Sequence, residues 1–370
     1  MEWDDMNERL GALSAAGVSI WLDDLSRSRL RSGNLAHLIQ EFSVTGVTTN
    51  PTIFAAALSE GSDYETQLAD LGGVPAEVAI TELCAADVRD ACDEFAETYR
   101  DSAGYDGRVS IEVSPALAND ARGTIEEAAK LHELVDRENV LIKIPATDAG
   151  LEAIEETIAS GISVNVTLIF SVRRYVQVME AYVRGLERAR ERGLDLSGIH
   201  SVASFFISRV DGEIDARLRA LGRSDLVGRA AVANALVAHG AFEEFVASER
   251  FEMLAASGAN IQRPLWASTG TKDPAYPDTL YVSDLVGPEI VNTMPEKTLR
   301  SFADHGTVNG SVEGRRAEGQ ALLDEVEAAG VNLDEVFELL EAQGVEKFLA
   351  SWAELVERVE AATAALGTRA

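Results

Sequence analysis

The sequence predicts an α/β fold in which eight parallel strands close into a barrel ringed by helices, a (β/α)8 or TIM barrel. Short β-branched runs alternate with longer helical patterns, and eight such runs can be counted. The chain of 370 residues is also long enough for one barrel-sized domain or for two smaller ones. A doubly wound open sheet is the alternative for the same alternation. We expect a single barrel domain over residues 1–370.

The expected strands are short apolar runs that end in turn residues or at helix starts. They are VSIWLDD (18–24), GVTTN (46–50), RVSIEVS (108–114), VLIKIP (140–145), ISVNVTLIF (162–170), HSVASFF (200–206), RPLWAS (263–268) and EIVNTM (289–294). A further run, TLYVSDLV (279–286), could be a ninth strand or an inserted turn. We discount it because a closed barrel of this type needs eight strands, which places them at about 18–294.

Helical patterns fill the connections, and two connections are longer than a single βα unit. The gaps at 50–108 and 206–263 should therefore hold extra helices. After residue 300 the pattern is helical only, which predicts a C-terminal extension over about 310–370 that packs on or over the barrel.

Two helices are expected within this extension. The first, NLDEVFELLEAQG, should begin at the capping residue Asn332 and end at Gly344. A last helix should follow to about residue 365.

The composition excludes several classes of partner. Acidic residues outnumber basic ones 62 to 32, giving a formal charge of −30, which argues against nucleic acid or an anionic membrane as a partner. No run approaches the roughly 20 apolar residues of a membrane helix, and the acidic start MEWDDMNERL is not a signal peptide. Cys84 and Cys92 have a spacing that suits neither a bridge nor a metal site. We expect a cytoplasmic protein, either monomer or homodimer.

The stretch VLIKIPAT (140–147) places Lys143 inside a β-branched apolar run. The chain has only four other lysines, so this one is not placed for solubility. Desolvation favours the neutral amine, so we expect its pKa to lie below the ordinary value of ~10.4.

Polar side chains gather on the inward faces of five strands, near their carboxyl ends, where barrel enzymes keep their active sites. The set is Asp23, Asn50, Glu112, Lys143, Asn165 and Thr167. Each member alone has a structural explanation. Asn50 precedes a proline and could be a turn residue, Asp23 could cap a helix, and Glu112 could simply neutralise Lys143. Together they predict a functional site.

An amine among carboxylates and amides indicates Schiff-base chemistry. There is no Gly-rich phosphate loop, no HExxH and no Cys/His cluster, and the five histidines are scattered. A buried lysine can attack a carbonyl, and the protonated imine then accepts the electrons of a breaking C–C bond without a metal. Asp23 and Glu112 fit the acid and base roles. The site composition predicts class I aldolase-type chemistry.

Eight motifs resemble the transaldolase family over nearly the full chain. They are WLDDLSR (21–27), GVTTNPTIF (46–54), SIEVSP (110–115), LIKIPAT (141–147), GISVNVTLIFS (161–171), SVASFFISRVD (201–211), RPLWASTGTKDP (263–274) and VNTMPEKTL (291–299). The resemblance is greatest to the longer bacterial subgroup that carries WLDDLSR and WASTGTK.

The resemblance implies transfer of a dihydroxyacetone unit from sedoheptulose 7-phosphate to glyceraldehyde 3-phosphate in the non-oxidative pentose phosphate pathway. The products are erythrose 4-phosphate and fructose 6-phosphate, and the resemblance implies neither a metal nor an organic cofactor. Lys143 matches the family's Schiff-base lysine, and Asp23 matches the aspartate that moves the proton of the hydroxyl at the cleaved bond. Glu112 and Thr167 match the pair that positions a catalytic water.

The same resemblance implies the substrate-binding residues. Asn50 and Asn165 match the amides that hold the donor's hydroxyls. Ser204 and Arg209 match a serine and a phosphate-binding arginine near the sixth strand. Many members have a second arginine after strand seven, where this chain has Lys272, which we carry over as a phosphate ligand.

Two other functions compete with this interpretation. A fructose 6-phosphate aldolase on the same scaffold would release free dihydroxyacetone, but that group is shorter. A non-catalytic barrel that only binds sugar phosphates or a partner protein would have no use for a buried amine beside a proton shuttle.

Overall fold

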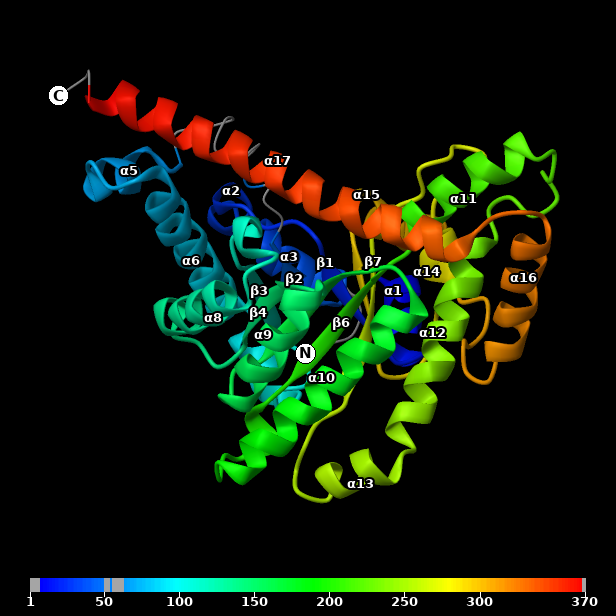
Figure 1. The fold of residues 1–370 in the computed structure, drawn as a ribbon. Helices are drawn as coiled ribbons and strands as arrows, with labels where there is room; N and C mark the ends of the chain where they lie inside the picture. The colour runs from blue at the N-terminus through cyan, green and yellow to red at the C-terminus, as the bar shows by residue number, and fades with distance from the viewer. Residues whose placement is uncertain (1–6, 50–53, 55–62, 368–370) are drawn as a thin grey trace.

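The strands form a closed barrel in a computed structural model that describes residues 7–49, 54 and 63–367. They are β1 (Val18–Leu22), β2 (Val44–Thr48), β3 (Arg108–Glu112), β4 (Val140–Pro145), β5 (Val164–Ile169), β6 (Ser201–Phe206), β7 (Gln262–Ala267) and β8 (Ile290–Met294). All pair in parallel in chain order, and β8 closes on β1. The predicted (β/α)8 barrel is confirmed, and the doubly wound sheet is not (Figure 1).

Helices surround the barrel and fill its long connections. They are α1 (Glu8–Ala15), α2 (Arg27–Arg31), α3 (Asn34–Glu41), α5 (Glu65–Leu71), α6 (Ala76–Glu94), α7 (Ala96–Asp101), α8 (Ala121–Val135), α9 (Asp148–Ala159), α10 (Val172–Glu191), α11 (Ser208–Ala220), α12 (Ala230–Val246), α13 (Glu249–Ala255), α14 (Leu280–Ser283), α15 (Glu296–His305), α16 (Arg316–Ala328) and α17 (Leu333–Gly367). The two long gaps do hold extra helices, α5 to α7 and α11 to α13. The discounted run at 279–286 contains the short helix α14 and no strand.

Side-chain caps at three strand-to-helix connections fix where the following helix begins. The side chains of Asp120, Thr147 and Ser171 accept hydrogen bonds from backbone N–H groups in the first turns of α8, α9 and α10, at 3.0–3.1 Å. Such caps satisfy donors that a helix start otherwise leaves free. The caps thus set where α8, α9 and α10 begin after the carboxyl ends of β3, β4 and β5.

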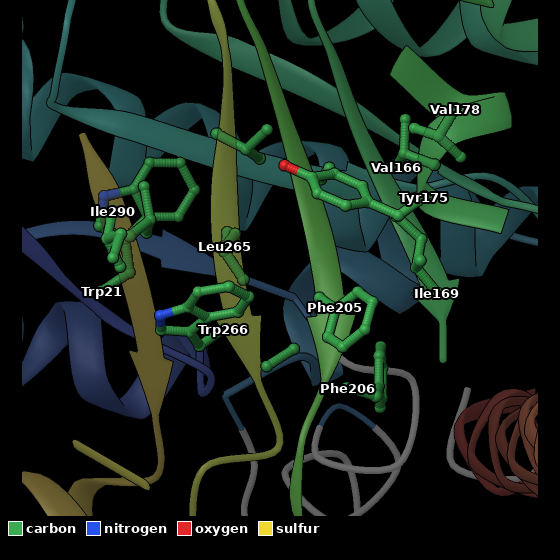
Figure 2. Close-up of a cluster of buried hydrophobic side chains, with 14 of the residues drawn as sticks. Trp21, Val166, Ile169, Tyr175, Val178, Phe205, Phe206, Leu265, Trp266 and Ile290 are labelled. Carbon is green, nitrogen blue, oxygen red and sulfur yellow. The ribbon is translucent and has the colours of Figure 1, made fainter. Parts of the chain in front are cut away.

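The apolar core between strands and helices contains a cluster of aromatic and aliphatic side chains (Figure 2). The ring of Phe205 on β6 lies 5.9 Å from Tyr175 of α10 and 6.0 Å from Trp266 of β7, in edge-to-face geometry. The Trp266 indole N–H donates to the carbonyl of Leu285 at 3.1 Å, so its one polar group is satisfied. This packing fixes β6 and β7 against the outer helices.

Side chains close the amino end of the barrel. Arg263 is the second residue of β7, and its guanidinium donates hydrogen bonds to Asp106 at 3.3 Å and to Ser19. Trp21 lies over Gly46, where even a Cβ would come within 2.6 Å of the indole. Only glycine leaves that space, so the indole of Trp21 can fill the barrel interior at this point.

A bulge in β5 interrupts the expected alternation of side chains. Pairing with β6 shifts register after Val166, and Leu168 adopts a left-handed φ of 61°. Unbroken alternation would place Leu168 on the same face as Val164 and Val166, under the outer helices. It instead contacts α17 at Gly344.

The C-terminal extension differs from the expectation at Gly344. Asn332 does cap the helix, accepting from the Glu335 N–H at 3.2 Å, but α17 passes through Gly344 without a break and has 35 residues in all, from Leu333 to Gly367. The two expected helices are therefore one. The glycine does not end the helix. It permits close packing, since a Cβ there would lie 3.0 Å from Leu168. Figure 1 shows α17 crossing over the barrel from the side of α11 to that of α5 and α6.

Candidate functional site

Lys143 lies at the carboxyl end of β4 with a side chain only 9% exposed. Its ammonium donates to the Thr49 carbonyl and to the Glu112 carboxylate, both at 3.2 Å. The ring of Phe348 lies 5.7 Å from the nitrogen. The lysine predicted from the sequence is therefore held by one carboxylate and one carbonyl under an aromatic ring.

Strand register explains why Glu112 and Lys143 meet. Glu112 on β3 pairs directly with Lys143 on β4, which in turn pairs with Asn165 on β5. Residues opposite one another on neighbouring strands point to the same face. Burial raises the pKa of Glu112, while the charge and hydrogen bond of Lys143 act in the opposite direction.

Asp23 is the first residue after β1. Together with Lys143 it lines a cavity at the carboxyl end of the barrel. Burial, with a contribution from the neighbouring Asp24, raises its pKa from 3.8 to about 6. The charges of Lys143, Lys272 and Arg29 oppose this rise. A carboxyl with a pKa near neutrality can both take up and give back a proton at physiological pH.

A cavity of about 200 Å³ at the carboxyl end of the barrel brings most of the predicted residues together. Its walls include six of them: Asp23, Lys143, Thr167, Ser204, Arg209 and Lys272. The predicted Asn50 lies outside the described residues. Glu112 lines a separate, smaller cavity of about 30 Å³, which it shares with Thr49 and Ile111.

Asn165 lies beneath this cavity with its side chain fully buried. Its amide N–H donates to Ser110 at 3.0 Å, and its carbonyl accepts from Ser204 at 2.7 Å. The amide therefore positions Ser204, which does line the cavity. Direct contact of Asn165 with a substrate stays a prediction.

Thr167 points a fully buried hydroxyl toward the cavity without a hydrogen-bond partner among the described residues. A buried hydroxyl normally finds a partner, because leaving it unpaired costs about 1–3 kcal/mol. The site therefore offers a hydrogen-bonding position near Lys143.

Arg209 and Lys272 lie on one side of the cavity. Arg209 follows β6 at the start of α11, half-buried, with its guanidinium 5.1 Å from the Phe206 ring. Lys272 is exposed in the loop after β7. Together they make this wall positive within a strongly acidic protein.

Sequence reasoning missed two site residues on α17. Lys347 and Phe348 both line the cavity, although they come from the C-terminal extension. Lysine is rare in this chain, so Lys347 in an acid-rich helix was an available signal. Nothing local to the sequence, however, shows that α17 crosses the mouth.

Within 7–49, 54 and 63–367, no group of His, Cys, Asp or Glu side chains could hold a metal ion. In those same ranges, no helix is both long and apolar enough to cross a membrane.

Comparisons with known proteins identify one family model and several relatives that match almost the whole chain. Residues 20–359 match the family described as Transaldolase/Fructose-6-phosphate aldolase. A transaldolase of Mycolicibacterium smegmatis is 57% identical over 96% of this chain and 97% of its own length. A transaldolase of Renibacterium salmoninarum is 56% identical over 98% and 99%, and a protein named transaldolase 2 of Streptomyces coelicolor is 56% identical over 96% and 97%. The chain belongs to the transaldolase/fructose-6-phosphate aldolase family.

Proposed function

We propose that this enzyme is a transaldolase that works through a Schiff base on Lys143. It transfers a dihydroxyacetone unit from sedoheptulose 7-phosphate to glyceraldehyde 3-phosphate, giving erythrose 4-phosphate and fructose 6-phosphate. The buried amine of Lys143, in contact with Glu112 at the mouth of the barrel, is the observation that carries the proposal. Full-length relatives named transaldolase favour transfer over the alternative, release of free dihydroxyacetone.

The reaction begins when the Lys143 amine attacks the ketone carbon of the donor. Loss of water from the adduct gives a protonated imine. Asp23 then takes the proton of the hydroxyl on the carbon that will become the aldehyde of the leaving aldose. The electrons of the breaking C–C bond move into the imine. The first aldose leaves and an enamine stays on the lysine. The enamine attacks the acceptor aldehyde, Asp23 returns its proton, and hydrolysis of the new imine frees the ketose.

The pKa of Asp23, about 6, suits these opposite tasks. A base must be ionised before cleavage, and the acid formed must give its proton back without a large energetic cost. A carboxyl with its ordinary pKa would be a weaker base for a hydroxyl proton.

Glu112 and Thr167 are assigned to the water chemistry of imine formation and hydrolysis. Glu112 contacts the amine directly, and the unpaired Thr167 hydroxyl can hydrogen-bond a water beside it. Because burial raises the pKa of Glu112, this carboxyl can exchange a proton with that water.

Substrate binding is assigned to the remaining polar groups. Ser204 and the amides of Asn50 and Asn165 would hold the donor's hydroxyls. Arg209 and Lys272 would bind the phosphate, the arginine as a planar fork and the lysine as a point charge. The imine itself is the electron sink, so the scheme needs no cofactor.

We also propose that residues 1–370 act as one domain, in the cytoplasm, as a monomer or homodimer. Apolar residues of α17, including Val336, Leu340 and Phe348, belong to the same core cluster as the strands. That shared core supports a single folding unit.

Borohydride trapping with fructose 6-phosphate, followed by peptide mass spectrometry, tests the chemistry. We expect a reduced three-carbon adduct on the peptide that contains Lys143, and neither adduct nor turnover above ~1% in Lys143→Ala. Lys130→Ala, which removes an exposed lysine on α8, is the control. An adduct on another lysine would refute the assignment. Adding glyceraldehyde 3-phosphate should then divert the unit into a ketose rather than free dihydroxyacetone.

A further inference from the structure

Three cationic side chains converge on one side of the cavity, and one comes from outside the barrel. Arg209, Lys272 and Lys347 all line the 200 Å³ cavity. The charge of Arg209, followed by burial and the charge of Lys272, lowers the pKa of Lys347. The ammonium on α17 thus lies within electrostatic reach of both other cations.

None of these three cations has a carboxylate partner within 4.0 Å among the residues the structure describes. Other arginines near this end of the molecule do. Arg173 contacts Glu338, Arg174 contacts Asp148, and Arg219 contacts Asp273 at 2.6 Å. In a chain with 62 acidic residues, three neighbouring cations that form no ion pair within 4.0 Å are suited to an anionic ligand.

Packing of α17 on both sides of Lys347 fixes the backbone from which this side chain extends. Gly344, one turn earlier, lies against Leu168 of β5, and the next residue, Phe348, is buried in the core. Further along α17, Leu355 and Val359 pack into a second apolar cluster with α5 and α6. The helix is therefore anchored beyond the cavity as well, as its path in Figure 1 shows.

We propose that Lys347 is a third ligand of the substrate's phosphate group, supplied by α17 rather than by the barrel. The proposal rests on the function proposed above, since it assigns a residue to the same site. Arg209 is half-buried, whereas Lys272 and Lys347 are exposed at the rim. Two flexible ammonium groups at the rim can close on a phosphate dianion that the arginine holds from the barrel side.

The first test compares a phosphorylated with an unphosphorylated ketone in the full-length enzyme. In Lys347→Ala, the fructose 6-phosphate concentration for half-maximal borohydride trapping should rise about 5- to 20-fold, because an exposed charge-assisted contact is lost. Trapping of dihydroxyacetone, which has no phosphate, should not change. Lys347→Arg should retain most of the affinity. Gln343→Ala, an exposed neutral site one turn earlier on α17, is the matched control.

A second test uses inorganic phosphate alone. Phosphate should raise the Tm of the wild-type protein, and Lys347→Ala should lose most of that shift. Equal shifts in both proteins would overturn the proposal, as would equal changes in trapping for the two ketones, which would indicate that Lys347 only holds the helix. If the wild-type enzyme binds phosphate through Lys347 but forms no adduct, the proposed catalytic function fails and this inference stands.

Discussion

Asp23→Asn should make the protein more stable at neutral pH. Burial raises the pKa of Asp23 because the folded state disfavours its charged form. At pH 7.5 the wild-type protein must nevertheless fold with this carboxylate ionised. An asparagine has nearly the same shape and carries no charge, so the substitution removes that cost.

The magnitude follows from the shift in pKa. Ordinary and folded values of 3.8 and about 6 differ by about two units, and each unit corresponds to about 1.4 kcal/mol. The ionised group therefore lowers the free energy of unfolding by about 3 kcal/mol at most above pH 6. Between pH 4 and 6 the folded state binds more protons than the unfolded one, so wild-type stability falls as pH rises. Below pH 4 both states are protonated and the cost disappears.

The assay is urea unfolding of wild-type and Asp23→Asn proteins at pH 4 and pH 7.5. We expect the variant to be more stable by about 1–3 kcal/mol at pH 7.5, with a small difference at pH 4. Asp24→Asn is the matched control. Its carboxylate is paired with Arg29 at 2.6 Å and also repels Asp23, so its loss breaks one interaction while relieving another and should not reproduce the gain at pH 7.5. An Asp23→Asn protein no more stable than wild type at pH 7.5, or a gain of equal size at both pH values, would refute the reasoning.

Three further outcomes are expected. Asp23→Asn should still form the trapped adduct while C–C cleavage slows by about 10²–10⁴-fold, and loss of the adduct would contradict the division of roles. Gly344→Leu should force α17 away from Leu168 and lower the free energy of unfolding in urea by about 1–3 kcal/mol. It should also weaken fructose 6-phosphate binding. If neither the stability nor the binding changes, the contact is unimportant. Phe348→Leu should admit water to the amine of Lys143, seen as more dihydroxyacetone released without an acceptor, at a stability loss of about 1 kcal/mol. A release rate equal to wild type would contradict that shielding role.

The barrel could be predicted because its signals are local. Strand propensity, side-chain alternation and turn residues recur in each βα unit, so every expected strand was found with shifts of only a few residues at its ends. Alternation also placed Glu112 and Lys143 on one face, and the register of β3 and β4 then brings them to 3.2 Å. These features depend on neighbours in sequence or on adjacent strands.

The sequence by itself determined the eight strands, the polar layer at their carboxyl ends and the lysine at its centre. Only the tertiary structure decided that α17 runs through Gly344, crosses the mouth and delivers Lys347 and Phe348 to the cavity. The physical reason is that a glycine in a helical pattern ordinarily favours a helix end, and only contact with Leu168, distant in sequence, makes it a packing site instead. Likewise, Asn165 proved to hydrogen-bond Ser110 and Ser204 beneath the cavity, an arrangement set by three different strands.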